Sequence, residues 1–130
     1  MATKLVTKNC VPCRGGIPPL DREKSTKFLS QTPGWLLSEN NTEIQKTFKF
    51  HDFREALDFT QKIGDLAEAE FHHPAVSFGW GYCTVTLQTK KIEGLHENDF
   101  IMAAKINDLA ENWREAIWLR KKKSFSLVVA

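Results

Sequence analysis

The sequence contains no run of about 18 consecutive apolar residues, the length that a helix needs to cross a bilayer. Its first twenty residues also lack the continuous apolar stretch of a secretory signal, so we expect neither a membrane span nor export. The net charge is only +2, too little for the phosphate-neutralising surface of a dedicated nucleic-acid binder. We therefore predict a cytoplasmic protein. Organelle targeting stays open, because Lys4, Lys8 and Arg14 precede the first acidic residue, Asp21.

Cysteine is scarce as well. The three cysteines, Cys10, Cys13 and Cys83, are an odd number without an export signal, which disfavours a disulfide framework and favours a reducing compartment. Cys10 and Cys13 have the spacing of zinc ligands, but no second pair completes a tetrahedral site, because Cys83 falls inside a predicted strand. A redox role for this pair would need a thioredoxin-like βαβ context, which the sequence lacks.

The length of 130 residues leaves room for one domain with a single core. The hydrophobic fraction of 42% and the charged fraction of 26% are typical of globular proteins. Residues 9–20 hold three of the five prolines and two of the seven glycines. We therefore predict an irregular N-terminal segment over residues 1–19, a folded domain over residues 20–120 and a C-terminal tail over residues 121–130.

Helix signals occur three times in the domain. Asp21 can cap a short helix that ends before Pro33, and Asp52 can cap a helix of about five turns that ends before Pro74. A last helix begins after Gly94 and carries one apolar stripe. This stripe consists of Met102, Ile106, Leu109, Trp113 and Ile117.

Strand signals lie between these helices. Residues 35–50 and 75–89 each contain two apolar-rich or alternating stretches separated by turn residues, which predicts two hairpins. A four-stranded antiparallel sheet must cover its apolar face, and amphipathic helices on that face do so. The sequence therefore predicts an α+β two-layer sandwich with helices on one face of the sheet, in the order α-β-β-α-β-β-α.

The densest cluster of chemically active side chains surrounds His72 and His73, at the predicted end of the second helix. Imidazole can both donate and accept a proton near neutral pH, and Glu68, four residues earlier, could orient the ring of His72. The alternative is that His72 only complements the helix dipole and His73 is a loop residue. Adjacent histidines before Pro74 project in different directions, so we expect no metal site here.

Two other features have ordinary structural explanations. The basic run Arg120–Lys123 could contact nucleic acid or an acidic surface, but four charges at a helix end are usually solvated and suit the dipole. Trp35, Trp113 and Trp118 are expected in the core or in a subunit interface. Trp80, which lies between two glycines, could instead stack on a flat heterocycle.

Several of these residues also form a discontinuous pattern. It consists of Glu68, then His72-His73-Pro74 after three residues, Trp80 after five more, Gly94-Leu95, and Asp99. This pattern resembles the signature of the pterin-4a-carbinolamine dehydratases, also called dimerisation cofactors of homeodomain transcription factors. The likeness covers roughly Trp35 to Leu109, and the residues after His96, together with Cys10-x2-Cys13, look most like the bacterial branch.

The resemblance implies a function beyond the fold. Such proteins remove water from a 4a-hydroxytetrahydropterin to give a quinonoid dihydropterin, which recycles the tetrahydrobiopterin-type cofactor of aromatic amino-acid hydroxylases. It further implies a homodimer or homotetramer, with the pterin as substrate and with no metal or organic cofactor.

The resemblance also implies roles for individual residues. His72 and His73 would be the general acid/base pair, with Asp99 and Glu68 as supporting carboxylates. The implied substrate-binding residues are Glu68, Phe71, His72, His73, Pro74, Trp80, Gln88, Thr89 and Lys90.

Lys90 departs from the family pattern, because it stands where a third histidine is usual. An ammonium group, with an ordinary pKa of about 10.4, can donate a proton but cannot accept one at neutral pH. We expect a dehydratase in which the third histidine is not essential. The alternatives are a non-catalytic protein-interaction module, such as a transcriptional coactivator, and a pterin binder that serves molybdopterin metabolism.

Overall fold

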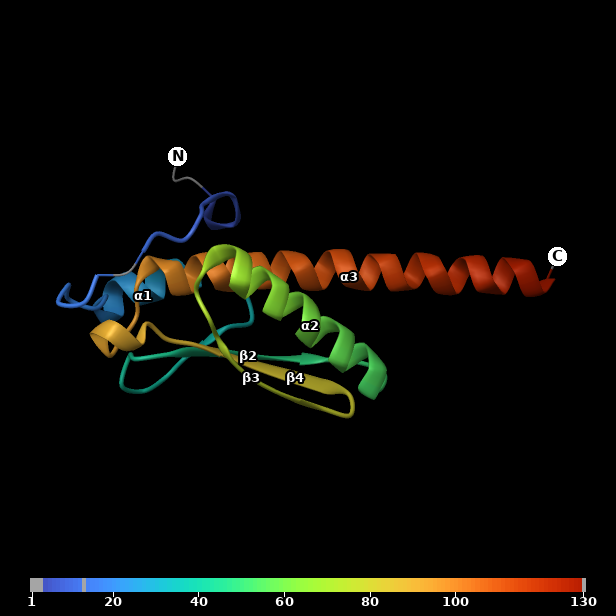
Figure 1. Ribbon diagram of the computed structural model, residues 1–130, viewed down its shortest axis with the longest axis horizontal. Coiled ribbons are helices and arrows are strands. Elements are labelled where there is room, and N and C mark those ends of the chain that lie inside the picture. Colours follow the sequence, from blue (N-terminus) through green and yellow to red (C-terminus); the bar gives the residue numbers. More distant parts are fainter. Residues whose placement is uncertain (1–3, 13, 130) are drawn as a thin grey trace.

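The computed structural model describes residues 4–12 and 14–129, and the side chains of residues 4–12 and 14–120. Its helices are η1 (Leu5–Thr7), α1 (Arg22–Leu29), α2 (Phe53–Glu70), η2 (Lys90–Ile92) and α3 (Glu97–Val129), where η marks a short 3-10 helix. Its strands are β1 (Leu36–Leu37), β2 (Ile44–Lys49), β3 (Ala75–Gly79) and β4 (Tyr82–Leu87). The predicted α+β class and element order are confirmed (Figure 1).

Helices α1 and α2 begin where the sequence predicts. The side chain of Asp21 accepts a hydrogen bond from the backbone N–H of Lys24, and Asp52 accepts one from Glu55. Each aspartate therefore satisfies a donor that the first helical turn leaves unpaired. Helix α2 ends at Glu70, and the next residue, Phe71, adopts a left-handed conformation with φ of 54°.

The four strands form one antiparallel sheet in the order β1-β2-β4-β3. The central pair joins the two hairpins, with Ile44 opposite Leu87 and Phe48 opposite Cys83. These four side chains are buried, whereas Thr47 and Thr84 are hydrogen-bonded to each other on the opposite face of the sheet. This alternation gives the sheet one apolar face and one polar face.

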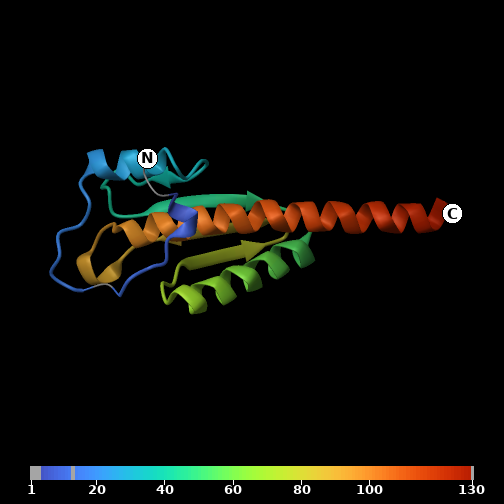
Figure 2. The same cartoon turned by 90° about the horizontal axis from the view of Figure 1, so that it is seen from above.

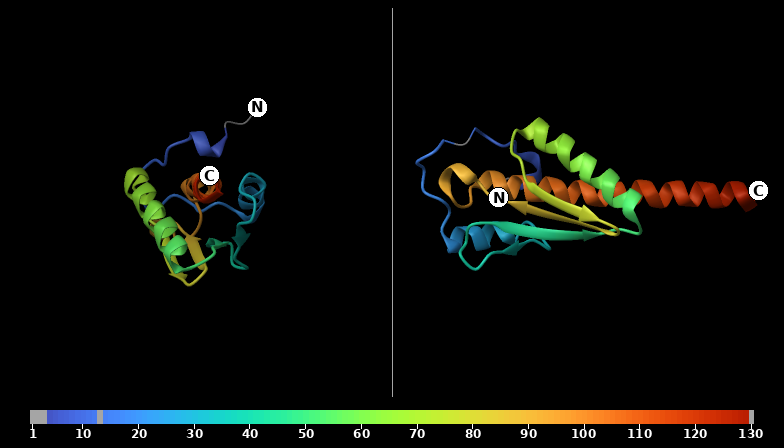
Figure 3. Two further views of the ribbon diagram at one scale, coloured as in Figure 1. Left: turned by 90° about the vertical axis from the view of Figure 1, so that its right-hand side faces the viewer. Right: turned by 60° about the horizontal axis from the view of Figure 1, so that its bottom comes forward.

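The helices cover the apolar face, as predicted. Helix α3 lies over the middle of the sheet, with α1 on one side of it and α2 on the other (Figures 2 and 3). Large fully buried side chains in the core include Phe59 and Ile63 from α2, and Phe100, Met102 and Ile106 from α3. Trp35 and Trp113 are buried in this core, whereas Trp118 is 58% exposed.

The segments at the two ends of the domain differ in their packing. Helix η1 precedes the predicted start of the domain, yet it packs on α3 and buries Leu5 in the core. Helix α3 runs through residue 120 to Val129 and projects beyond the sheet (Figure 1). The proposed boundaries at residues 19 and 120 stay predictions. Within residues 4–12 and 14–129, no helix has the length and apolar character that crossing a membrane requires.

Candidate active site

One end of the sheet gathers the polar residues that the sequence singled out. Strand β3 pairs with β4 so that Ala75, at its start, lies opposite Thr86, near the end of β4. The loop that links α2 to β3 therefore lies beside the chain that leaves β4. This register brings His72 and His73 close to Gln88 and Thr89, although the two pairs are far apart in the sequence.

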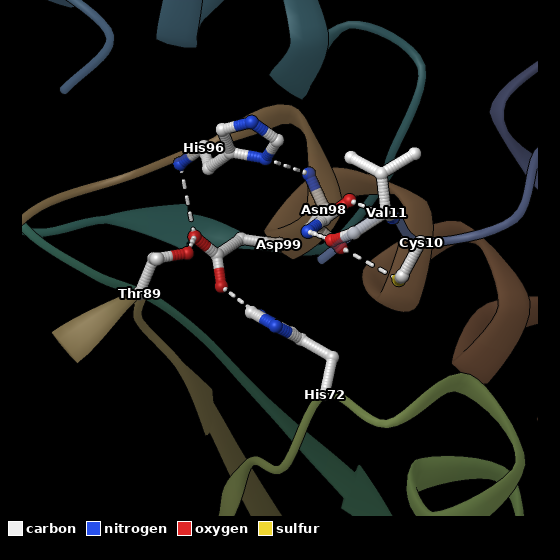
Figure 4. Close-up of polar contacts among 7 residues, drawn as sticks. All are labelled: Cys10, Val11, His72, Thr89, His96, Asn98 and Asp99. Carbon is white, nitrogen blue, oxygen red and sulfur yellow. Dashed lines mark hydrogen bonds and ion pairs between the residues drawn. The ribbon is translucent and has the colours of Figure 1, made fainter. Parts of the chain in front are cut away.

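Asp99 is the centre of a buried polar network at this end of the sheet. One carboxylate oxygen, Oδ1, lies 2.7 Å from Nε2 of His72. The other, Oδ2, accepts hydrogen bonds from the hydroxyl of Thr89 and from the backbone N–H of His96 (Figure 4). Asp99 is completely buried, and a carboxylate can only accept hydrogen bonds. The proton in the pair with His72 therefore belongs to Nε2, which leaves Nδ1 as the accepting nitrogen of that ring.

His73 has a separate carboxylate partner. Its Nε2 lies 2.6 Å from Oε2 of Glu68, and both side chains are largely exposed. The expectation that Glu68 orients the ring of His72 is wrong, because α2 ends at Glu70 and the left-handed Phe71 redirects the chain. The two histidines thus belong to two distinct carboxylate pairs, one buried and one facing solvent.

A cavity of about 330 Å³ lies over these residues. Its lining consists of Val11, Pro12, Phe71, His72, His73, Gln88, Thr89, Lys90 and Lys91. Ligand pockets are typically at least about 300 Å³, so this cavity can hold a small bicyclic molecule. Most of its lining can form hydrogen bonds, and the aromatic ring of Phe71 is 84% exposed.

The cavity brings together six of the residues expected to bind substrate: Phe71, His72, His73, Gln88, Thr89 and Lys90. Asp99 and Glu68 lie behind the two histidines, and Pro74 links His73 to β3. Trp80 is not brought to this cavity. It lies in the turn between β3 and β4, at the opposite end of that hairpin, and is 72% exposed.

Sequence reasoning missed His96 and Asn98, two residues at the start of α3 that organise the site. Nδ1 of His96 accepts a hydrogen bond from the backbone N–H of Asn98, and Asp99 accepts one from the backbone of His96. This reciprocal arrangement is the geometry of a capping box, in which the third helical residue reaches back to the cap. An acidic residue three positions after His96 was the available sequence signal.

Sequence reasoning also missed the N-terminal segment as part of the site. The buried side chain of Asn98 binds the backbone of Val11, and the carboxylate of Glu70 accepts a hydrogen bond from the backbone N–H of Cys10. Burial and the nearby negative charge of Glu70 raise the pKa of the Cys10 thiol to about 12. Cys13, the other half of the cysteine pair noted in the sequence, lies outside the described residues.

Across residues 4–12 and 14–129, no three side chains of histidine, cysteine, aspartate or glutamate are grouped so that they could hold one metal ion. The polar groups described above are paired with one another, which suits proton transfer and hydrogen bonding.

Comparison with known proteins places the site in a family context. The family model described as pterin 4 alpha carbinolamine dehydratase matches residues 18–109. A relative from Methylococcus capsulatus is 56% identical over 109 residues, which cover 84% of this chain and 96% of the relative. One from Azoarcus sp. is 54% identical over 110 residues, which cover 85% of this chain and 94% of the relative. Both carry the provisional name pterin-4-alpha-carbinolamine dehydratase.

A solved structure shares the fold. The crystal structure of a transcriptional coactivator/pterin dehydratase from Brucella melitensis superposes with a TM-score of 0.67 at 32% sequence identity. The match covers 71% of this chain and 98% of the Brucella chain.

Proposed function

Because this chain belongs to the pterin-4-alpha-carbinolamine dehydratase family, we propose that it removes water from a 4a-hydroxytetrahydropterin and releases a quinonoid dihydropterin. One observation carries the proposal at the level of mechanism. Both histidines of the family motif line a single cavity, and each is paired through Nε2 with its own carboxylate. Two neighbouring imidazoles held in this way can act as an acid and a base in one reaction.

The reaction requires one proton to be given and one to be taken. The bond between C4a and its hydroxyl oxygen breaks, and the oxygen leaves as water once an acid has protonated it. A base removes the proton from N5, and the electron pair of that N–H bond forms the new double bond between N5 and C4a. No proton is gained or lost overall, so the two catalytic groups return to their starting states by exchange with solvent.

The surroundings of the two rings suggest which one is the base. His72 is nearly buried, and its Nε2 proton is committed to Asp99, so Nδ1 is the nitrogen free to accept the N5 proton. His73 is 53% exposed and is paired with Glu68, a carboxylate that can stabilise a protonated ring. We assign His73 as the acid that protonates the leaving hydroxyl, because solvent can reprotonate it after each turnover.

The proposal extends to the cellular setting. We propose that the protein acts in the cytoplasm and, as the family resemblance implies, forms a homodimer or homotetramer that recycles the tetrahydrobiopterin-type cofactor of an aromatic amino-acid hydroxylase. In this proposal the histidine pair performs the chemistry without a metal or an organic cofactor.

A dehydration assay tests the proposal. Chemically generated 4a-hydroxytetrahydropterin is mixed with the protein, and formation of the quinonoid product is followed by absorbance in a stopped-flow instrument. We expect dehydration to be faster than in buffer and the double variant His72→Ala/His73→Ala to lose this acceleration. His51→Ala is the matched control, because His51 is an exposed histidine just before the N-terminal end of α2. Full activity in the double variant would refute the assignment.

A non-catalytic role is the second candidate, and a specific observation favours it. The Brucella structure is described as a transcriptional coactivator as well as a pterin dehydratase. An interaction module would bind its partner in a pull-down experiment even when both histidines are replaced. A pterin binder that serves molybdopterin metabolism would instead bind the pterin without converting it.

A further inference from the structure

We propose that residues Lys8–Pro12 form a fixed wall of the ligand cavity and contact the bound pterin directly. The inference rests on the proposed function and identifies a part of the binding site that lies outside the family match, which starts at residue 18. Two residues of this segment, Val11 and Pro12, line the same cavity as the two histidines.

A buried side chain fixes the middle of this wall. Asn98 is 1% exposed, and its amide nitrogen donates to the backbone carbonyl of Val11 at 2.7 Å. Its amide oxygen accepts from the backbone N–H of Val11 at 3.0 Å (Figure 4). Both backbone polar groups of Val11 are therefore satisfied by one side chain, as they would be in a strand pair.

Two further contacts hold the part of the segment that precedes Val11. The backbone N–H of Cys10 donates to Oε1 of Glu70 at 2.8 Å, and Nζ of Lys8 lies 2.6 Å from Oε2 of Glu97. Glu70 is the last residue of α2, two positions before His72, and Glu97 is the first residue of α3, two positions before Asp99. The wall is thus tied to both helices that supply the site.

The wall also adds apolar surface to a mostly polar cavity. Apart from Phe71, the other lining side chains are polar or charged. The side chain of Val11 is 57% exposed, although Asn98 holds both the N–H and the carbonyl of its backbone. A flat heterocycle gains binding free energy by covering exposed apolar surface, and a surface that is already fixed costs little ordering when it binds.

Binding measurements test the contact. The affinity of the full chain for 6-methyl-7,8-dihydropterin, a stable analogue of the substrate, is measured by titration calorimetry. Val11→Ala removes two methyl groups from the wall, and we expect binding to weaken about three- to tenfold. Ile17→Ala is the matched control, because Ile17 is a partly exposed aliphatic residue that follows the wall in the N-terminal chain and does not line the cavity. Equal affinity of Val11→Ala and the unmodified chain would overturn the proposal.

A second pair of variants tests the fixed position of the wall without disturbing the buried Asn98. Glu70→Ala removes the acceptor for the N–H of Cys10, whereas Glu70→Gln keeps an acceptor oxygen at that place. We expect Glu70→Ala to accelerate hydrogen exchange at the amides of Cys10 and Val11 and to weaken binding of the analogue, and Glu70→Gln to do neither. Unchanged exchange in Glu70→Ala would contradict the anchoring.

These outcomes separate the wall from the proposed function. A chain that binds the analogue but does not dehydrate the carbinolamine would refute the dehydratase and leave the wall supported if Val11→Ala still binds more weakly. A chain that does not bind the analogue at all would refute both. An active dehydratase whose affinity is unaffected by Val11→Ala would refute the wall alone.

Discussion

His72 and Asp99 are in contact across 2.7 Å although 27 positions separate them in the sequence. The aspartate is completely buried at the start of α3, whereas the histidine reaches the cavity from the loop after α2. A buried carboxylate with three hydrogen-bond donors has little freedom to move, so it fixes both the tautomer and the direction of the imidazole ring.

Thr89 is a positioning residue for this pair, because its hydroxyl donates to Oδ2 of Asp99 at 2.7 Å. Thr89→Val keeps the shape of the side chain but removes the donor. We expect kcat for carbinolamine dehydration to fall about tenfold with little change in KM, and the free energy of unfolding to fall by about 2 kcal/mol. Thr89→Ser, which retains the hydroxyl, should keep most of the kcat and most of the free energy of unfolding. A Thr89→Val enzyme with unchanged kcat would contradict the role.

The sandwich could be predicted because the sequence signals for its helices and strands depend on residues that are close together in the chain. The caps at Asp21 and Asp52 and the alternation in the strands depend on neighbouring residues, and each lies where expected. The pairing of Glu68 could not be predicted in the same way. Residues four apart in a helix lie on one face, so the spacing predicted that Glu68 contacts His72. The helix ends before His72, however, and after the left-handed turn at Phe71 it is His73 that contacts Glu68.

The N-terminal wall was unpredictable for a different reason. Its contacts join Cys10 to Glu70 and Val11 to Asn98, across 60 and 87 positions, and they involve backbone groups that every sequence contains. The prolines and glycines of residues 9–20 predict irregular chain, and residues 9–12 and 14–20 contain no helix or strand. Irregular chain, however, carries no periodicity from which a buried or cavity-lining position could be read.

Lys90 lines the cavity, and the family resemblance implies a third histidine at its position. If the lysine stands in for a helper group, Lys90→His should raise kcat, by up to the roughly 100-fold contribution of one acid/base group. Lys91→His is the matched control, because Lys91 lines the same cavity from the same short helix. Stopped-flow dehydration rates of both variants decide the question. An unchanged or lower rate in Lys90→His would show that the lysine has a role of its own.

Phe71 combines a strained backbone with an exposed ring. Its φ of 54° is a conformation that costs a bulky residue about 1 kcal/mol or more, and its ring packs edge-on against His73 with 5.7 Å between ring centres. Glycine adopts this φ freely. We therefore expect Phe71→Gly to raise the melting temperature by a few degrees while weakening binding of the pterin analogue. Phe71→Ala should weaken binding without the gain in stability. A lower melting temperature in Phe71→Gly would contradict the claim that the backbone at Phe71 is strained.

The thiol of Cys10 should be unusually inert for a side chain that is only half-buried. Its pKa of about 12 keeps it protonated at pH 8, and only the thiolate reacts with iodoacetamide. Against an ordinary thiol with a pKa of about 8.5, the reactive fraction at pH 8 is smaller by roughly a thousandfold. In a Cys13→Ser background, mass spectrometry should find slow alkylation that accelerates about tenfold per pH unit between pH 8 and 10. Because the charge of Glu70 contributes to the raised pKa, Glu70→Gln should lower the pKa and speed the reaction at every pH in this range. Alkylation as fast as that of glutathione would mean that the wall does not hold Cys10 against Glu70 in solution.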